Sequence, residues 1–197
     1  MPSPRERMVI SAALLIRERG AQATAIADVL EHSGAPRGSA YHYFPGGRTQ
    51  LLCEAIDYAA DYIAAKITDA ESGLHALDVL VEYYRKQLLR SDYRAGCPVV
   101  AVTVEAGDPA KPDEASAVID RAAAAFTRWT GLIAQRLSSE GTSAEQAAEL
   151  AMLITASIEG AIVVARASRD VKPLDLVHNH LRDLISAATS ERKSRER

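Results

Sequence analysis

The chain has 197 residues, a formal net charge of −3, and a composition that is 48% hydrophobic and 5% aromatic. This length allows one large or two small domains with a substantial core. The shortage of aromatic residues, beside many Ala and Leu, argues against a sheet protein and favours helices.

Two cysteines, Cys53 and Cys97, are too few for a disulfide framework and lack metal-ligand spacing. The N-terminal residues do not form a charged-then-apolar leader, and no apolar run near the ~18 residues of a membrane span is expected. We therefore expect a reduced, cytoplasmic protein with no cofactor, no metal and no membrane partner.

The charges are unevenly distributed along the chain. The first 50 residues hold six arginines and four acids, whereas the remainder holds 17 bases and 22 acids. No acid occurs between Glu31 and Glu54. A small basic face on an acidic body indicates a polyanion bound at one end, although chance also accounts for so small an excess.

Three short helices are predicted at the N-terminus. Ser3 caps the first helix, which begins at Pro4, has Glu6 three residues after its cap and ends at Gly20. Thr24 is expected to cap the second helix. The same residue also offers its hydroxyl or backbone N–H to a phosphate.

A turn at Gly34 precedes the third helix, predicted over residues 36–44. Pro36 suits its first position, and Ala40 and Phe44, four residues apart, are expected to pack inward. This pattern is a helix-turn-helix, whose second helix presents its N-terminus to base edges. A helical hairpin with a solvated basic face is the alternative. The candidate base contacts are Arg37, Gly38 and Ser39, and the candidate phosphate contacts are Tyr41, His42, Tyr43 and Arg48.

Apolar residues at helical spacing predict further helices over residues 48–66, 74–91, 113–138, 143–168 and 174–187. The Val-rich run 96–105 alternates like a strand, but a single strand has no partner, so we expect a buried helix there. Residues 107–112 are predicted to form a loop, and residues 189–197 a disordered charged tail. The fold class is therefore all-α, with about nine helices.

The last two predicted helices carry more apolar surface than one side of a monomer needs. Small residues at positions 156, 157, 160 and 161 allow a second helix to pack closely. This predicts a homodimer built on a four-helix bundle, although both helices are also explained as the centre of one subunit. The expected interface residues are Leu150, Leu153, Ile154, Ser157, Ala161, Val177, Leu181 and Leu184.

The run from Gly34 to Arg48 resembles the signature of the TetR family of transcriptional regulators. It has a turn Gly, a basic residue, a Gly-Ser pair, Tyr-x-x-Phe and a basic residue that opens the next helix. Its Phe-Pro-Gly-Gly-Arg form is similar to the LmrA/YxaF-like branch, as is a patch around Gly96-Cys97-Pro98. Pro36 departs from the family pattern, because Ser or Thr often caps the recognition helix there.

The resemblance implies a helix-turn-helix DNA-binding domain over residues 1–50 and a helical effector-binding and dimerisation domain over residues 51–188. It also implies a repressor that a small hydrophobic effector releases from a pseudo-palindromic double-stranded DNA operator. The helix over residues 48–66 would link the two domains. Ligand pockets are mostly apolar with a few polar groups. The candidate effector contacts, each also explicable as an ordinary core or surface position, are Tyr84, Gln87, Cys97, Thr103, Phe126, Trp129 and Ser157.

Two other classes of protein are weighed against a regulator. An enzyme is disfavoured because the histidines at positions 32, 42, 75, 178 and 180 form no recognised catalytic or metal pattern with Cys, Ser or an acid. A dimeric helical or small-molecule-binding module without DNA binding is the second alternative. Specific, salt-sensitive DNA binding would separate it from a regulator.

Overall fold

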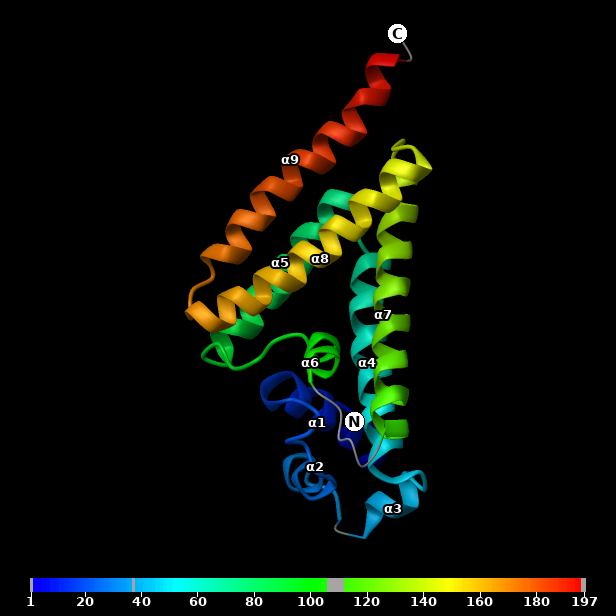
Figure 1. Cartoon of the computed structure of the whole chain (residues 1–197), viewed down its shortest axis with the longest axis vertical. Coiled ribbons are helices and arrows are strands. Elements are labelled where there is room, and N and C mark those ends of the chain that lie inside the picture. Colours follow the sequence, from blue (N-terminus) through cyan, green and yellow to red (C-terminus); the bar gives the residue numbers. More distant parts are fainter. Residues whose placement is uncertain (1, 37, 106–111, 196–197) are drawn as a thin grey trace. The chain divides into compact units, whose positions relative to one another are not determined.

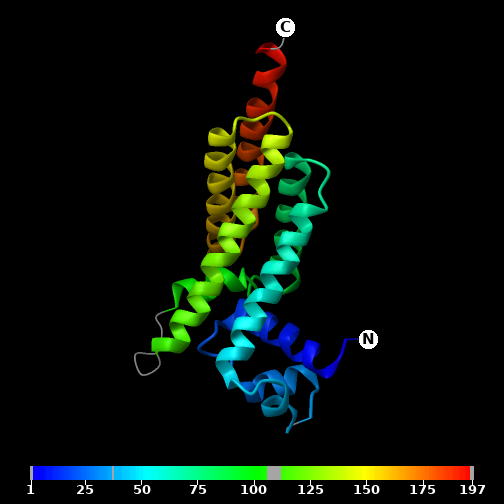
Figure 2. The same cartoon turned by 90° about the vertical axis from the view of Figure 1, so that its right-hand side faces the viewer.

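The computed structural model describes the backbone of residues 2–36, 38–105 and 112–195. Within these ranges the chain forms nine helices and no strand (Figures 1 and 2), which confirms the predicted all-α class. The chain divides into two compact units. Unit 1 consists of Met1–Asp61 and Arg94–Ala125, and unit 2 of Tyr62–Tyr93 and Phe126–Arg197.

Unit 1 holds α1 (Pro4–Arg19), α2 (Ile26–Ser33), α3 (Ser39–Tyr43), α6 (Pro98–Val104) and the first parts of α4 (Gly47–Thr68) and α7 (Pro112–Ser139). α1 packs against α2 and α6. An ion pair of 2.7 Å between Arg5 and Glu54 joins α1 to α4, and one of 3.2 Å between Arg121 and Asp57 joins α7 to α4. The core side chains include Met8, Ala12, Ile16, Val29, Phe44, Leu51, Leu52, Ile56 and Val99.

α6 is a helix, as predicted. Hydrogen bonds join the residues just before and just after it to the C-terminal end of α1 and the turn that follows. Before α6, the N–H of Gly96 donates to the carbonyl of Arg17 at 2.9 Å. After α6, the carboxylate of Glu105 accepts the N–H groups of Ala21 and Gln22, both at 3.0 Å. The turn that follows α1 therefore gets two of its hydrogen-bond partners from a segment 84 and 83 residues further along the chain.

Unit 2 holds α5 (Gly73–Arg90), α8 (Ala144–Ser168), α9 (Lys172–Arg195) and the remaining parts of α4 and α7. α5, α8 and α9 pack against one another. The Asp78 carboxylate on α5 accepts from Arg182 at 2.6 Å and lies 2.7 Å from Nε2 of His178, so two residues of α9 bind one acid of α5. The core side chains include Ile63, Ile67, Leu77, Leu88, Trp129, Ile133, Leu137, Ile154, Ile158, Ile162, Leu174 and Ile185.

Serine caps begin helices in both units. The Ser3 hydroxyl accepts the N–H of Glu6 at 3.2 Å, and the Glu6 carboxylate accepts the N–H of Ser3 at 2.7 Å, which is the predicted reciprocal cap of α1. The hydroxyls of Ser72 and Ser143 accept N–H groups in the first turns of α5 and α8. Such caps satisfy N–H groups that have no partner within the helix.

The structure differs from the expectations at the C-terminus and at the domain boundary. α9 continues as helical backbone to Arg195 instead of ending near residue 187, which corrects the predicted disordered tail over residues 189–195. The predicted division at residue 50 does not coincide with the two units, because residues 51–61 and 94–125 belong with the first helices. Residues 107–111 of the predicted loop lie outside the described residues.

α8 is more apolar than expected. Within the described residues, its length and its mean hydropathy of 1.8 over an 18-residue window suffice for a membrane span, which corrects the expectation that no such run is present. One helix of this kind is weak support for a membrane, because core helices of soluble proteins pass the same test. One side of α8 supplies Ile154, Ile158 and Ile162 to the core of unit 2.

Candidate nucleic-acid interface

α3 is held in place by two packed side chains and a preceding turn. Gly34 ends α2 with φ 65° and ψ 23°, the left-handed conformation in which many helices end. The carbonyl of Pro36 accepts both the N–H and the hydroxyl of Ser39, at 2.9 and 2.7 Å, so α3 begins at Ser39 and not at residue 36. Ala40 and Phe44 are each 1% exposed, which confirms the inward face predicted from their spacing.

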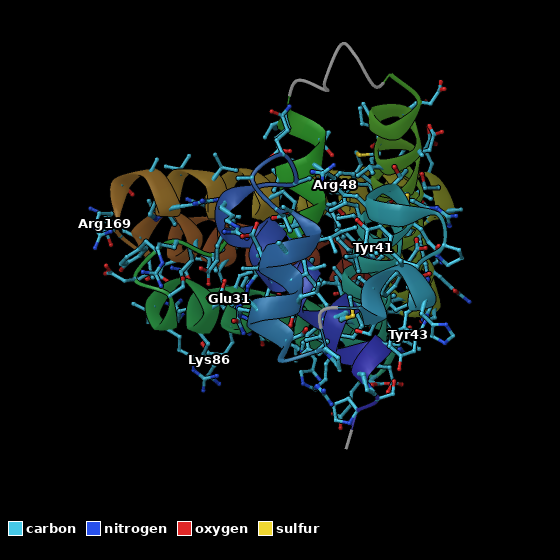
Figure 3. The ribbon with its side chains drawn as sticks, turned by 90° about the horizontal axis from the view of Figure 1, so that it is seen from below. Glu31, Tyr41, Tyr43, Arg48, Lys86 and Arg169 are labelled. Atoms are coloured by element: carbon cyan, nitrogen blue, oxygen red, sulfur yellow. The ribbon has the colours of Figure 1, made fainter. Side chains whose placement is uncertain are left out.

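The opposite face of α3 is open to solvent. Tyr41 is 73% exposed, His42 is also exposed, and the half-buried Tyr43 ring meets the His42 ring edge-on at 5.3 Å between centroids. Figure 3 shows Tyr41 and Tyr43 at the end of unit 1 formed by α3. Donors and aromatic rings without a nearby acid in the sequence suit contact with phosphates and base edges.

The N-terminus of α3 has open space around it. Gly38 has φ −84°, a value open to any residue, and nothing lies within 4 Å of the place where a Cβ would stand. The fold itself therefore does not require glycine here, whereas a close approach by a partner molecule would. Arg37, the predicted base contact, lies outside the described residues and stays a prediction.

Thr24 has a different role from the one predicted. α2 is capped at Ala25, whose N–H donates to the Asp28 carboxylate at 2.9 Å, so the prediction of a Thr24 cap is wrong. The Thr24 side chain is 1% exposed, and its hydroxyl donates to the carbonyl of Gly20 at 2.7 Å. Its N–H donates to the carbonyl of Ala21 at 2.9 Å. Both donors that were expected to meet a phosphate are thus used inside unit 1.

Arg48 is bound to the turn between α1 and α2. Its Nε donates to the carbonyl of Thr24 at 3.1 Å, and one terminal nitrogen donates to the carbonyl of Ala21. Burial lowers the pKa of the Arg48 guanidinium, and the Glu105 carboxylate opposes that shift. These bonds give Arg48 a structural role at the start of α4, and the expected phosphate contact stays a prediction.

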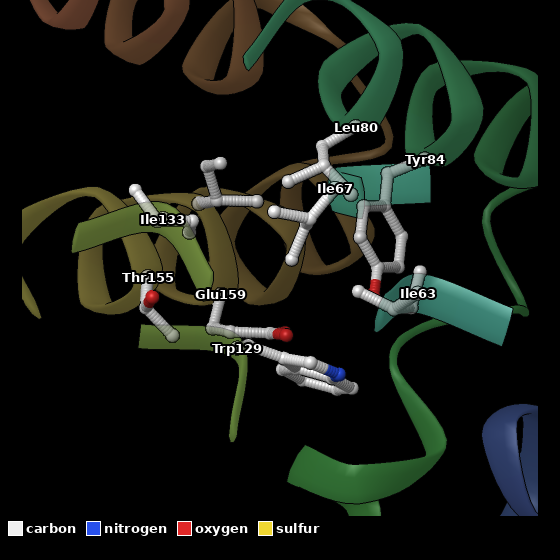
Figure 4. Close-up of a pocket in the computed structure, with 9 residues that line it drawn as sticks. Ile63, Ile67, Leu80, Tyr84, Trp129, Ile133, Thr155 and Glu159 are labelled. Carbon is white, nitrogen blue, oxygen red and sulfur yellow. The ribbon is translucent and has the colours of Figure 1, made fainter. Parts of the chain in front are cut away.

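Unit 2 contains a small apolar pocket that is partly open to solvent (Figure 4). α4, α5, α7 and α8 each contribute side chains to it. The lining residues are Ile63, Ile67, Leu80, Tyr84, Trp129, Ile133, Thr155, Ile158 and Glu159.

Two of the predicted effector contacts, Tyr84 and Trp129, line this pocket. Phe126 stands beside it, with its ring edge-on to Trp129 at 5.5 Å, and is not among the lining residues. Gln87 and Ser157 are half-buried in unit 2 and do not line it either. The other two candidates, Cys97 and Thr103, belong to unit 1, where Cys97 is 4% exposed and the hydroxyl of Thr103 donates to the carbonyl of Val99.

The sequence reasoning missed the polar side chains that α8 supplies to the pocket. Glu159 and Thr155 stand four residues apart and therefore on one face of the helix. A signal was available for Glu159, because it interrupts the apolar run between residues 150 and 165 of α8. An acid within a buried helical pattern is uncommon and indicates a partner or a function.

Part of the predicted dimer interface is core. Leu150, Ile154, Ala161 and Leu181 are at most 8% exposed within the single chain and pack in the core of unit 2, so they offer little surface to a partner, while Ser157 and Val177 are half-buried. Leu153 and Leu184 are 46% and 45% exposed and remain candidates. The outer face of α8 and α9 also presents large apolar side chains that were not predicted: Met152, Val163, Val164 and Leu176.

The described residues offer little to a metal ion. No three or more His, Cys, Asp or Glu side chains gather in this part of the chain in a way that would hold one. Both cysteines are free thiols, with Cys53 half-buried and Cys97 buried.

Two family models match the chain. The model for bacterial regulatory proteins of the tetR family covers residues 10–55, and that for the transcriptional regulator LmrA/YxaF-like C-terminal domain covers residues 74–180. The HTH-type transcriptional regulator Rv0196 of Mycobacterium tuberculosis is 62% identical over 98% of this chain and 99% of its own length. The HTH-type transcriptional regulator LmrA of Bacillus subtilis is 26% identical over 92% of this chain and 96% of its own.

Solved structures share the fold. A TetR transcriptional regulator from Legionella pneumophila superposes with a TM-score of 0.75 at 19% identity, over 93% of this chain and 98% of that one. The regulatory protein TetR from Rhodobacter sphaeroides gives 0.74 at 23% identity, over 92% and 98%. The sequence relatives favour a DNA-binding regulator over a helical module that lacks DNA binding. The chain therefore belongs to the TetR family of transcriptional regulators, with a C-terminal domain of the LmrA/YxaF-like type.

Proposed function

We propose that this regulator is a cytoplasmic homodimeric repressor that leaves a pseudo-palindromic operator when a small hydrophobic effector binds in unit 2. The observation that supports DNA binding is the exposed face of α3. Its polar and aromatic groups face solvent while Ala40 and Phe44 fix the helix from behind. Residues 1–50 are assigned to DNA binding, and residues 51–188 to effector binding and dimerisation.

The DNA contacts are assigned to the exposed side of α3 and the turn before it. Gly38 leaves room for the duplex at the helix N-terminus. Base-edge contacts are assigned to Arg37 from its place in the sequence and to the oxygen of Ser39 as an acceptor, because the Ser39 hydroxyl already donates to the Pro36 carbonyl. Phosphate contacts are assigned to Tyr41, His42 and Tyr43. Thr24 is removed from this set because its donors are used internally.

The dimer interface is assigned to the outer face of α8 and α9. Met152, Leu153, Val163 and Val164 on α8 are between 46% and 60% exposed. Large apolar side chains exposed together on one helix often mark a protein interface. The exposed Gly160 lies between Leu153 and Val163 in the sequence. It has open space where a Cβ would stand, which allows a second α8 to approach closely.

Effector binding reaches the DNA-binding part through α4. Ile63 and Ile67 of α4 line the pocket, and the first turn of the same helix carries Arg48, which is bound to the turn before α2. A ligand that fits one position of α4 better than another shifts the population between DNA-binding and released dimers. The shift is limited by the difference in ligand affinity between the two states.

Fluorescence anisotropy with labelled duplex from upstream of the protein's own gene tests the DNA-binding part. Specific binding is expected, and the logarithm of the association constant should fall with the logarithm of salt concentration by about 0.9 per phosphate neutralised. Half-sites about 34–36 Å apart are expected from two-fold symmetry. Equal affinity for this duplex and for a scrambled duplex at every salt concentration would contradict the proposal.

A further inference from the structure

The pocket of unit 2 combines an apolar wall with one charge. Of the nine lining residues, all within the described part of the chain, Glu159 alone carries a carboxyl group, and Tyr84 and Trp129 supply aromatic rings. Tyr84 and Trp129 are 4% and 3% exposed, so both rings belong to the interior of the unit. In Figure 4 the Glu159 carboxylate points toward the side of the pocket where Trp129 and Tyr84 lie.

We infer that the effector is a lipophilic cation, such as a protonated or quaternary amine with a small hydrocarbon or aromatic body. This rests on the proposed function, since it names the ligand class of the same site. An ionised carboxylate at the wall of an apolar pocket attracts a cation and repels an anion more strongly than it would in water. The faces of Trp and Tyr rings add to the attraction for a cation.

Unit 2 also holds an ammonium group against aromatic rings, outside the pocket. Nζ of Lys66 lies 4.8 Å from the Tyr62 ring centroid and 5.1 Å from that of Tyr83. Lys66 is not among the residues that line the pocket, so its charge does not enter the lining. The pocket is small and partly open to solvent, so the ligand body must be small and is only partly enclosed. The aliphatic side chains of Ile63, Ile67 and Ile133 would cover that body.

The chain contains a single tryptophan, Trp129, so its intrinsic fluorescence reports on this pocket. The probes are benzyltrimethylammonium and its neutral carbon isostere, neopentylbenzene, which have the same shape and differ in charge. An anion of comparable size, 4-tert-butylbenzoate, is the third probe. The wild-type protein is expected to bind the cation about 10-fold more tightly than the isostere and the anion most weakly.

Glu159→Gln keeps the size of the side chain and removes its charge. It is expected to weaken cation binding about 10-fold and to leave the affinity for the neutral isostere unchanged. Glu149→Gln, an exposed acid of the same helix, is the matched control and should bind all three probes as the wild type does. Equal affinity of the wild type for cation and isostere would overturn the inference, and that comparison requires no variant to fold.

DNA binding is measured separately, by anisotropy with the operator duplex and each probe. Release of DNA by the neutral or anionic probe but not by the cation would overturn the charge assignment and leave the proposed function standing. Glu159-dependent cation binding that leaves DNA affinity unchanged would support the inference about the site and contradict effector release. Glu159-dependent binding together with DNA release supports both.

Discussion

α3 and α8 present opposite kinds of surface. α3 has five residues, buries Ala40 and Phe44 around its last turn and exposes donors and aromatic rings. α8 has 25 residues, buries one face along its whole length and exposes Met152, Leu153 and other large apolar side chains on another. The first surface suits a charged, hydrated partner such as DNA, and the second suits another apolar surface.

The two helices also differ in what holds them. A five-residue helix is not stable by itself in water, so α3 depends on its packed side chains and on the turn at Gly34. Its exposed side chains can then change without unfolding the protein. α8 is held by its own buried face, and its outer apolar face gains stability only when a partner covers it. Substitutions on the exposed face of α3 should therefore affect DNA binding, and substitutions on the outer face of α8 should affect dimerisation.

The largest expected effect comes from Leu153→Asp in the proposed dimer face. Each dimer would bury two carboxylates without a counter-charge, which costs about 3 kcal/mol or more and raises the dimer dissociation constant at least ~100-fold. Sedimentation velocity over a range of protein concentrations measures it. Leu89→Asp on α5, where the leucine is 53% exposed, is the matched control and should leave the dimer intact. An unchanged dimer in Leu153→Asp would remove α8 from the interface.

Tyr41→Ala tests the α3 surface. Because Tyr41 is 73% exposed, the free energy of unfolding should change by less than about 0.5 kcal/mol. Loss of a phosphate contact in each half-site should weaken operator binding by about 1–2 kcal/mol, roughly 5–30-fold. Anisotropy titration measures the affinity. Tyr58→Ala on α4, where the ring is 39% exposed, is the control and should bind DNA like the wild type. Equal affinities of the two variants would place the DNA contacts elsewhere.

The features set by local chemistry were predictable from the sequence. The Ser3 cap, the turn at Gly34 and the inward pair Ala40 and Phe44 each depend on residues within four positions of one another. The helix assignment of residues 98–104 was also correct, because a lone strand would leave its backbone groups without partners.

The features set by distant segments were not predictable. Helical spacing does not distinguish a face covered by the same subunit from one covered by a second copy, so core residues Ile154 and Leu181 were assigned to the dimer. The role of Arg48 depends on carbonyl groups that only the folded turn places beside α4. The position of Glu105 over Gly20 is likewise a product of the fold, in which a Cβ at Gly20, with φ 87°, would collide with the carboxylate.

Arg48→Ala tests whether the DNA-binding surface includes Arg48. If the guanidinium serves the turn before α2, its loss leaves the carbonyl groups of Ala21 and Thr24 short of a donor and lowers the free energy of unfolding by about 1–2 kcal/mol. Urea unfolding measures this change. The salt dependence of operator binding should keep the wild-type slope. A slope that becomes shallower by about one phosphate, with unchanged stability, would restore Arg48 to the phosphate contacts.

The smallest effect is expected at the contact between α5 and α9. This contact positions α9, which together with α8 forms the proposed dimer face. Burial alone would raise the pKa of Asp78, but hydrogen bonds from Arg182 and His178 outweigh it and hold the pKa below its ordinary value. The stabilisation by Asp78 is therefore present above the unfolded pKa of about 3.9 and is lost as pH falls through the folded value. Since the Asp78 side chain is 41% exposed, Asp78→Asn should cost less than about 1 kcal/mol at pH 7.

Urea unfolding of the wild type and of Asp78→Asn at pH 7 and at pH 3.5 tests that sign. The two proteins should differ at pH 7 and come closer together as the acid is protonated, with the wild type losing the larger share of its stability. Asp183→Asn, an exposed acid one residue after Arg182, is the matched control and should follow the wild type. If the difference in free energy of unfolding between Asp78→Asn and the wild type grew at low pH, the protonated carboxyl group of Asp78 would be the stabilising form. The contact of α9 with α5 would then not depend on this ion pair.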